Sequence, residues 1–138
     1  MDRLAAFLAL NGCLALVATM IGGLLLYRSI VDGRRPEDWH LVHAGGTSRG
    51  VMLLALAATI RFAELPQSQL ELASKLIVYF VWASILAMFL RAATGHLGYS
   101  LKGPALNRLI FLLYASGVAA VFVGFAWLIY GFIVALLA

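Results

Sequence analysis

The chain has 138 residues, of which 64% are hydrophobic and 12% are charged, and its mean hydropathy is +0.99. This composition excludes an ordinary soluble globular domain and is typical of a membrane protein. The net charge of +4 does not indicate nucleic-acid binding, because the ten Lys and Arg residues are spread over the ends of the apolar runs and form no basic face.

Four apolar runs predict four membrane-spanning helices, since a helix needs about 20 mostly apolar residues to cross a bilayer. In chain order we expect helices at about 4–27, 36–62, 70–91 and 105–137, within one domain that covers residues 1–138. The short connections predict an antiparallel arrangement, so the expected fold class is an all-α integral membrane four-helix bundle. Small residues recur in all four helices and allow close helix contact, which favours a homo-oligomer.

The basic residues indicate how the helices are oriented in the membrane. Those between the first and second helices, and between the third and fourth, outnumber those on the other side of the membrane. The positive-inside rule then places both connections in the cytoplasm and both termini outside. The residues on the predicted cytoplasmic side are Arg28, Arg34, Arg35, Arg91, Lys102 and Arg108.

The start of the second helix carries a clear signal. Pro36 is followed by Glu37 and Asp38. Proline is favoured at the first helical position, and carboxylates in the first turn meet the positive end of the helix dipole. We therefore expect this helix to begin near Pro36, ahead of its apolar part.

The stretch PEDWHLVHAGGTSRG, residues 36–50, concentrates polar side chains in an otherwise apolar chain and holds two of the three histidines. At 100° per residue, His43 and Gly50 lie almost in line along the helix, with Gly46 and Thr47 to either side. A flat macrocycle could place its iron against such an imidazole and its ring against the small residues. We therefore expect a haem-binding face at His43, Gly46, Thr47 and Gly50.

Residues around this face have both a structural and a functional interpretation. Trp39 flanks the face and could contact the macrocycle, although Trp39 and His40 are also typical anchors at the lipid headgroups. Arg34 and Arg35 in the preceding loop, and Lys102 and Arg108 in the connection between the third and fourth helices, could pair with haem propionates.

Two further polar residues complete the candidate site. Arg49 lies inside the apolar zone, where an arginine is costly and is either paired or functional. It is about 120° around the helix from His43, so we expect it to face a neighbouring helix or subunit, as an interhelix partner or as an anchor for a propionate or substrate. His96 is in the third loop, on the same side of the membrane as His43, and could supply a second axial ligand. A zinc or copper ion shared by His40 and His43 would lack further ligands.

The same stretch resembles the styrene oxide isomerases through a P-E-x-W-x-x-x-H-x-G-x-x-x-x-G pattern. The resemblance implies a homotrimer of four-helix chains that holds haem b, with His43 as the axial ligand. It also implies that the ferric iron acts as a Lewis acid on a small apolar epoxide, which rearranges to an aldehyde by a 1,2-hydride shift. Such a reaction requires no proton-transfer pair, and the sequence does not identify which side chains are catalytic. The pattern is formed here by Pro36, Glu37, Trp39, His43, Gly45 and Gly50.

The sequence also departs from the family that it resembles. Where the family has Asn, Asp and Tyr side chains that help form the pocket, this chain has Arg49, Phe80 and Met88, and Tyr79 or Tyr99 could substitute for the missing tyrosine. Two alternatives to the isomerase therefore stay open. One is a b-type haem protein for electron transfer or for redox or gas sensing, and the other is a haem-free membrane assembly subunit.

Overall fold

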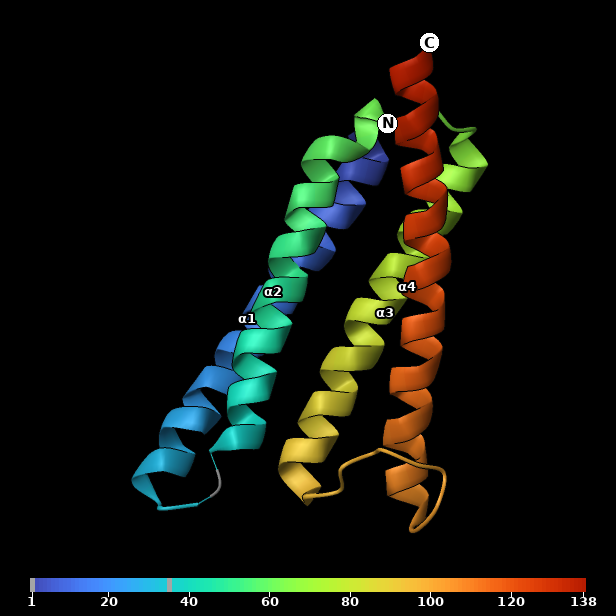
Figure 1. The fold of residues 1–138 in the computed structure, drawn as a ribbon. Helices are drawn as coiled ribbons and strands as arrows, with labels where there is room; N and C mark the ends of the chain where they lie inside the picture. The colour runs from blue at the N-terminus through green and yellow to red at the C-terminus, as the bar shows by residue number, and fades with distance from the viewer. Residues whose placement is uncertain (1, 35) are drawn as a thin grey trace.

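The computed structural model describes residues 2–34 and 36–138 as a bundle of long helices (Figure 1). These are α1 (Asp2–Val31), α2 (Glu37–Thr59), α3 (Gln67–Thr94) and α4 (Ala105–Leu137), and a short 3-10 helix, η1 (Ile60–Phe62), extends α2. The described residues contain no strand. All four long helices have the length and apolar composition needed to cross a membrane, which confirms the predicted all-α membrane fold.

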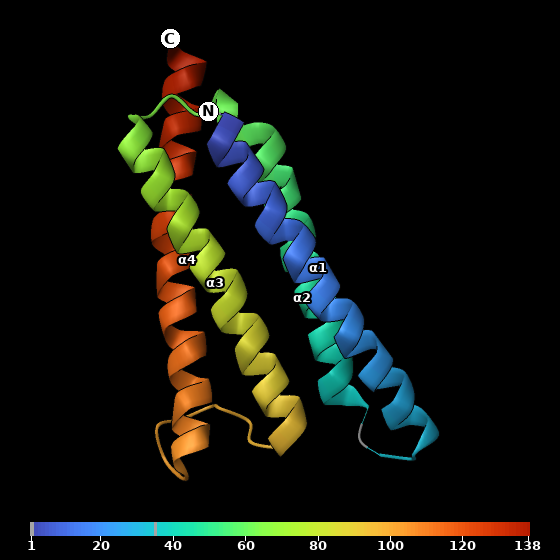
Figure 2. The same cartoon turned by 180° about the vertical axis from the view of Figure 1, so that it is seen from behind.

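The helices alternate in direction along the chain. The α1–α2 turn and the α3–α4 loop lie at one end of the bundle, and both termini lie at the other (Figures 1 and 2). Helix α2 begins at Glu37, directly after Pro36, whose carbonyl oxygen accepts a hydrogen bond of 2.8 Å from the His40 amide. Pro36 therefore stands just before the first turn, where its missing N–H costs nothing.

The small residues of the helices are used in contacts within the chain. The backbones of α1 and α2 approach each other closely where a Cβ on Gly12 would lie 3.0 Å from the Gly50 carbonyl oxygen, and one on Gly50 would lie 3.1 Å from that of Gly12. Between α3 and α4, a Cβ on Gly124 would lie 3.0 Å from the Ala73 carbonyl oxygen. The chain is thus built from two tight helical hairpins, as expected where small residues permit close packing in a membrane.

The two hairpins are joined by fewer, larger side chains. At the middle of α3, the Trp82 indole N–H donates a 2.9 Å hydrogen bond to the Asn11 side-chain oxygen of α1. Near the loops, the rings of Trp39 and Phe89 pack edge to face at 5.9 Å. The hairpins stand farther apart at the loop end than at the end with the termini (Figures 1 and 2). The candidate residues of α2 lie toward this wider end.

Candidate functional site

His43 lies on the flank of α2 that meets α1, with its side chain exposed. Its Nδ1 lies 3.1 Å from the Thr19 carbonyl oxygen of α1. A carbonyl oxygen can only accept a hydrogen bond, so Nδ1 carries the proton and the neutral ring keeps its lone pair on Nε2. Gly23 makes room for the ring, because a Cβ there would lie 2.9 Å from Nδ1. The fold therefore holds one tautomer of an accessible imidazole.

Of the other residues predicted for the haem face, Thr47 lies beside His43, whereas Gly46 and Gly50 are buried and cannot contact a macrocycle. The Thr47 hydroxyl donates a 2.6 Å hydrogen bond to the His43 carbonyl oxygen and lies 3.3 Å from the buried Thr19 hydroxyl. Gly46 and Gly50 are buried, the first under the Thr19 methyl group and the second under the Leu16 side chain. Helix α1 covers these two glycines, because they form the contact between α1 and α2.

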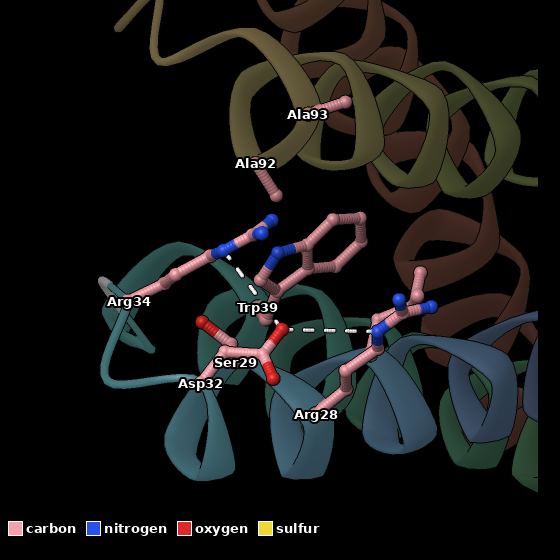
Figure 3. Close-up of a pocket in the computed structure, with 8 residues that line it drawn as sticks. Arg28, Ser29, Asp32, Arg34, Trp39, Ala92 and Ala93 are labelled. Carbon is pink, nitrogen blue, oxygen red and sulfur yellow. Dashed lines mark ion pairs between the residues drawn. The ribbon is translucent and has the colours of Figure 1, made fainter.

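A second group of predicted residues gathers around a pocket of about 490 Å³ beside the α1–α2 turn, which we call the loop-1 pocket (Figure 3). Arg28 and Arg34 each place Nε 3.8 Å from an Asp32 carboxylate oxygen, with the indole of Trp39 beside them. Both arginines are largely exposed, and such long ion pairs hold a side chain weakly. Arg35, also predicted near the haem, lies outside the described residues. The pocket is lined by Leu25, Arg28, Ser29, Asp32, Arg34, Trp39, Ala92 and Ala93.

Arg49 lies on the other flank of α2, in a pocket of about 560 Å³ formed with α3, α4 and the loop between them. The guanidinium stands over the Phe80 ring, 5.2 Å from its centre, and Nη1 donates a 2.6 Å hydrogen bond to the Gly45 carbonyl oxygen. As predicted from the helix angle, Arg49 faces neighbouring helices and is turned away from His43. This Arg49 pocket is lined by Leu41, Arg49, Met88, Arg91, Gly98, Tyr99, Phe111, Tyr114, Ala115 and Val118.

The rim of the Arg49 pocket is held by an ion pair between the two hairpins. Arg91 Nε of α3 donates a 2.7 Å hydrogen bond to the Asp38 carboxylate of α2, and its Nη1 donates one of 2.9 Å to the Tyr99 hydroxyl. Asn107 fixes the loop by accepting the Gly98 amide at 2.9 Å. These contacts bring residues from α2, α3 and the α3–α4 loop to one side of the pocket.

The remaining histidines lie at the loop end of the bundle. His40 is exposed one turn before His43 on α2, and His96 is half-buried in the α3–α4 loop, where its amide lies 3.4 Å from the Thr94 hydroxyl. Among residues 2–34 and 36–138, no cluster of three or more His, Cys, Asp or Glu side chains could hold a metal ion.

A family model described as styrene oxide isomerase matches residues 4–133. The chain belongs to the styrene oxide isomerase family. No curated protein matches it. Because the match reaches into all four helices, it confirms the resemblance well beyond the motif in residues 36–50, and the chain is a multi-pass membrane protein of that family.

The three departures from the styrene oxide isomerase pattern come together in the fold. A Cβ on Gly45 would lie 3.1 Å from Arg49 Nη1 and 3.2 Å from Met88 Sδ, and the Arg49 guanidinium covers Phe80. Arg49 and Met88 both line the Arg49 pocket, and Phe80 lies directly beneath the guanidinium. The family pattern names these positions, but only the fold shows that they are neighbours.

The structure also distinguishes the two candidate tyrosines and adds residues that the sequence did not single out. Tyr79 is exposed, and its hydroxyl is 2.7 Å from that of Ser116 on α4, whereas Tyr99 lines the Arg49 pocket. Tyr114 also lines this pocket, and Arg91 pairs with Asp38 at its rim. The sequence signal for this pair was the opposite charge of Asp38, in the first turn of α2, and Arg91, in the last turn of α3, because these two turns lie at the same end of the bundle.

Proposed function

We propose that this chain is a haem b-dependent epoxide isomerase in which His43 is the axial ligand of the haem iron. The observation that carries the proposal is the exposed His43 ring, whose Nδ1–H donates to the Thr19 carbonyl oxygen and leaves Nε2 free. Histidines that bind metals commonly donate their second ring N–H to a backbone carbonyl or carboxylate, which fixes the ring and raises its basicity.

The surrounding residues fit a haem in charge as well as in ligand type. Among the described residues, Arg28 and Arg34 are held by long, exposed ion pairs, so either side chain can turn to a propionate. We assign them this role together with Arg35, and Trp39 lines the pocket in which Arg28 and Arg34 lie. Thr47 flanks His43, whereas Gly46 and Gly50 allow α1 to pack closely against α2 and so support the site indirectly.

When bound, a ferric haem supplies a Lewis acid for the epoxide oxygen. The chain's own part is to hold the imidazole, to keep water away from the reacting carbon atoms and to orient the substrate. In a 1,2-hydride shift the hydrogen moves within the substrate with its electron pair, so the rearrangement needs no general acid or base from the protein. The Arg49 pocket agrees with this requirement, because Asp38, the carboxylate at its rim, is engaged by Arg91.

We further propose that the site is completed between subunits of a homotrimer. His43 and the Arg49 pocket lie on opposite flanks of α2, and His43 is exposed in the single chain. In a cyclic trimer, one face of each subunit meets a different face of the next. Such an assembly can set the His43 flank of one subunit against the Arg49 pocket of its neighbour, and it removes the imidazole from contact with lipid.

We also propose a location and an orientation for the protein in the membrane. The α1–α2 turn and the α3–α4 loop share one end of the bundle, and six of the ten basic residues, from Arg28 to Arg108, lie in these connections or in the adjoining helix ends. The positive-inside rule favours the cytoplasmic side of a bacterial-type inner membrane for this end, with both termini outside.

A pyridine haemochrome assay on purified protein tests the proposal. Wild type should contain haem b, and His43→Ala should lose it. The matched control is His40→Ala, which removes an exposed imidazole one turn away on the same helix. Haem-free wild type, or haem retained by His43→Ala and lost from His40→Ala, would contradict the assignment.

The spin state of the bound haem then separates an isomerase from an electron-transfer protein. Two strong axial ligands leave no position for a substrate and favour electron transfer. We expect a high-spin ferric spectrum that shifts on addition of styrene oxide and is unchanged in His96→Ala. A low-spin spectrum that becomes high-spin in His96→Ala would identify His96 as a second ligand and would contradict the isomerase.

A further inference from the structure

The Arg49 pocket contains a cation that the protein leaves largely unpaired. Of the five N–H donors on its guanidinium, one has a hydrogen-bond partner within the described residues, the Gly45 carbonyl oxygen. Nε is buried without a partner, and no described carboxylate lies within ion-pair distance of the group. Stacking on Phe80 offsets part of the charge but satisfies none of the in-plane donors.

Two carboxylates at the loop end of the bundle are already engaged by other arginines. Asp38 accepts from Arg91, and Arg91 also donates to Tyr99. Asp32 lies between two arginines beside the loop-1 pocket. The charge at Arg49 is therefore not balanced by any of these carboxylates, and the pocket carries a net positive charge.

The position of Arg49 makes this arrangement costly. It follows Glu37 by 12 residues, which places it about 18 Å along α2 from the start of the helix. An arginine at the centre of a membrane span is costly to insert and usually marks a functional site. A lipid headgroup lies at the membrane surface, so a ligand that reaches Arg49 is small enough to enter the span.

We propose that the Arg49 pocket binds a small carboxylate with an apolar, aromatic body. The carboxylate pairs with the Arg49 guanidinium, and the body lies against Phe111, Tyr114 and Val118. The pocket volume of about 560 Å³ is within the usual range for small-molecule sites. If the protein is the isomerase proposed above, on which this extension rests, its substrate is an aryl epoxide that carries a carboxylate, and Arg49 determines that specificity.

The test compares two probes of nearly equal shape, phenylacetate and phenylacetamide, by calorimetric titration of the protein in nanodiscs of zwitterionic lipid. Wild type should bind the carboxylate at least about tenfold more tightly than the amide. Arg49→Gln should abolish this preference, and Arg49→Lys should keep part of it. The matched control is Arg61→Gln, which removes another arginine of the same segment that stacks on a phenylalanine, Phe62 at 4.8 Å, outside the pocket.

Haem content, measured on the same samples, separates this inference from the proposed function. Equal affinity of wild type for the two probes overturns the inference, even if the protein contains haem. Loss of haem in Arg49→Gln also overturns it, because Arg49 would then anchor a propionate. A haem-free wild type that still prefers phenylacetate refutes the haem proposal and leaves the carboxylate site in place. Since the preference is measured on wild type, poor folding of a variant does not remove the test.

Discussion

His43 and Arg49 are polar side chains on opposite flanks of α2, and the fold treats them differently. His43 is exposed, yet its Nδ1 is held by the Thr19 carbonyl oxygen across the tight α1–α2 contact. Arg49 is half-buried in the looser region between the hairpins, and its Nε has no partner among the described residues. The tight α1–α2 hairpin holds the His43 ring, and with it Nε2, in a fixed orientation before a ligand binds. The looser space between the hairpins leaves the Arg49 guanidinium without a carboxylate partner among the described residues, so a molecule from outside the chain can pair with it.

Removing the Asp38–Arg91 ion pair, which joins the two hairpins beside the Arg49 pocket, should have the largest effect on stability. Asp38→Asn removes the charge that pairs with Arg91, and the two side chains are only 20% and 18% exposed. We expect the free energy of unfolding in micelles to fall by about 1.5–3 kcal/mol. Asp32→Asn is the control, because its partners are exposed arginines at 3.8 Å, and it should cost about 0–1 kcal/mol. Equal losses in the two variants would show that the Asp38–Arg91 pair does not hold the hairpins.

Replacing each of the two polar residues by an apolar one tests the comparison itself. Arg49→Met removes an unpaired charge from the membrane span, so the free energy of unfolding should rise by about 1 kcal/mol or more. His43→Leu breaks a satisfied hydrogen bond and should lower it by about 0.5–1 kcal/mol. Denaturation in the same detergent measures both. A loss of stability in Arg49→Met would mean that the guanidinium is satisfied after all.

A subtler change tests whether α1 orients the His43 ring. Gly23→Ala places a methyl group 2.9 Å from Nδ1, so the ring must shift away from the Thr19 carbonyl oxygen. We expect haem affinity, measured by titration of haem into the apo protein, to fall about fivefold, which corresponds to about 1 kcal/mol. Gly117→Ala is the control, since its methyl group would lie at an ordinary 3.5 Å from its nearest neighbour. Unchanged affinity in Gly23→Ala would indicate that the orienting hydrogen bond has no part in binding.

The fold was largely predictable from the sequence, for a simple physical reason. A bilayer requires long apolar helices, and four such runs with short connections leave few arrangements other than an antiparallel bundle. The start of α2 after Pro36 was visible in the first-turn acids. The motif in residues 36–50 also identified the family, which the match over residues 4–133 confirms.

The candidate site was less predictable, because helix angles on one helix do not say which neighbour covers each face. Gly46 and Gly50 share a face with His43, but α1 occupies that face beside them. The pairing of Asp38 with Arg91 and the meeting of Arg49 with Phe80 join residues on different helices. No local pattern reports such contacts, so the Arg49 pocket emerged only from the packing of the two hairpins.

The most direct measurement of the central claim is the ferrous resonance Raman spectrum of the purified protein. If His43 Nε2 binds the iron, the iron–histidine stretching band shifts to lower frequency when histidine is labelled with ¹⁵N, and it is absent from His43→Ala and present in His40→Ala. A band that is insensitive to the label, or one that persists in His43→Ala, would contradict the assignment of His43 as the ligand.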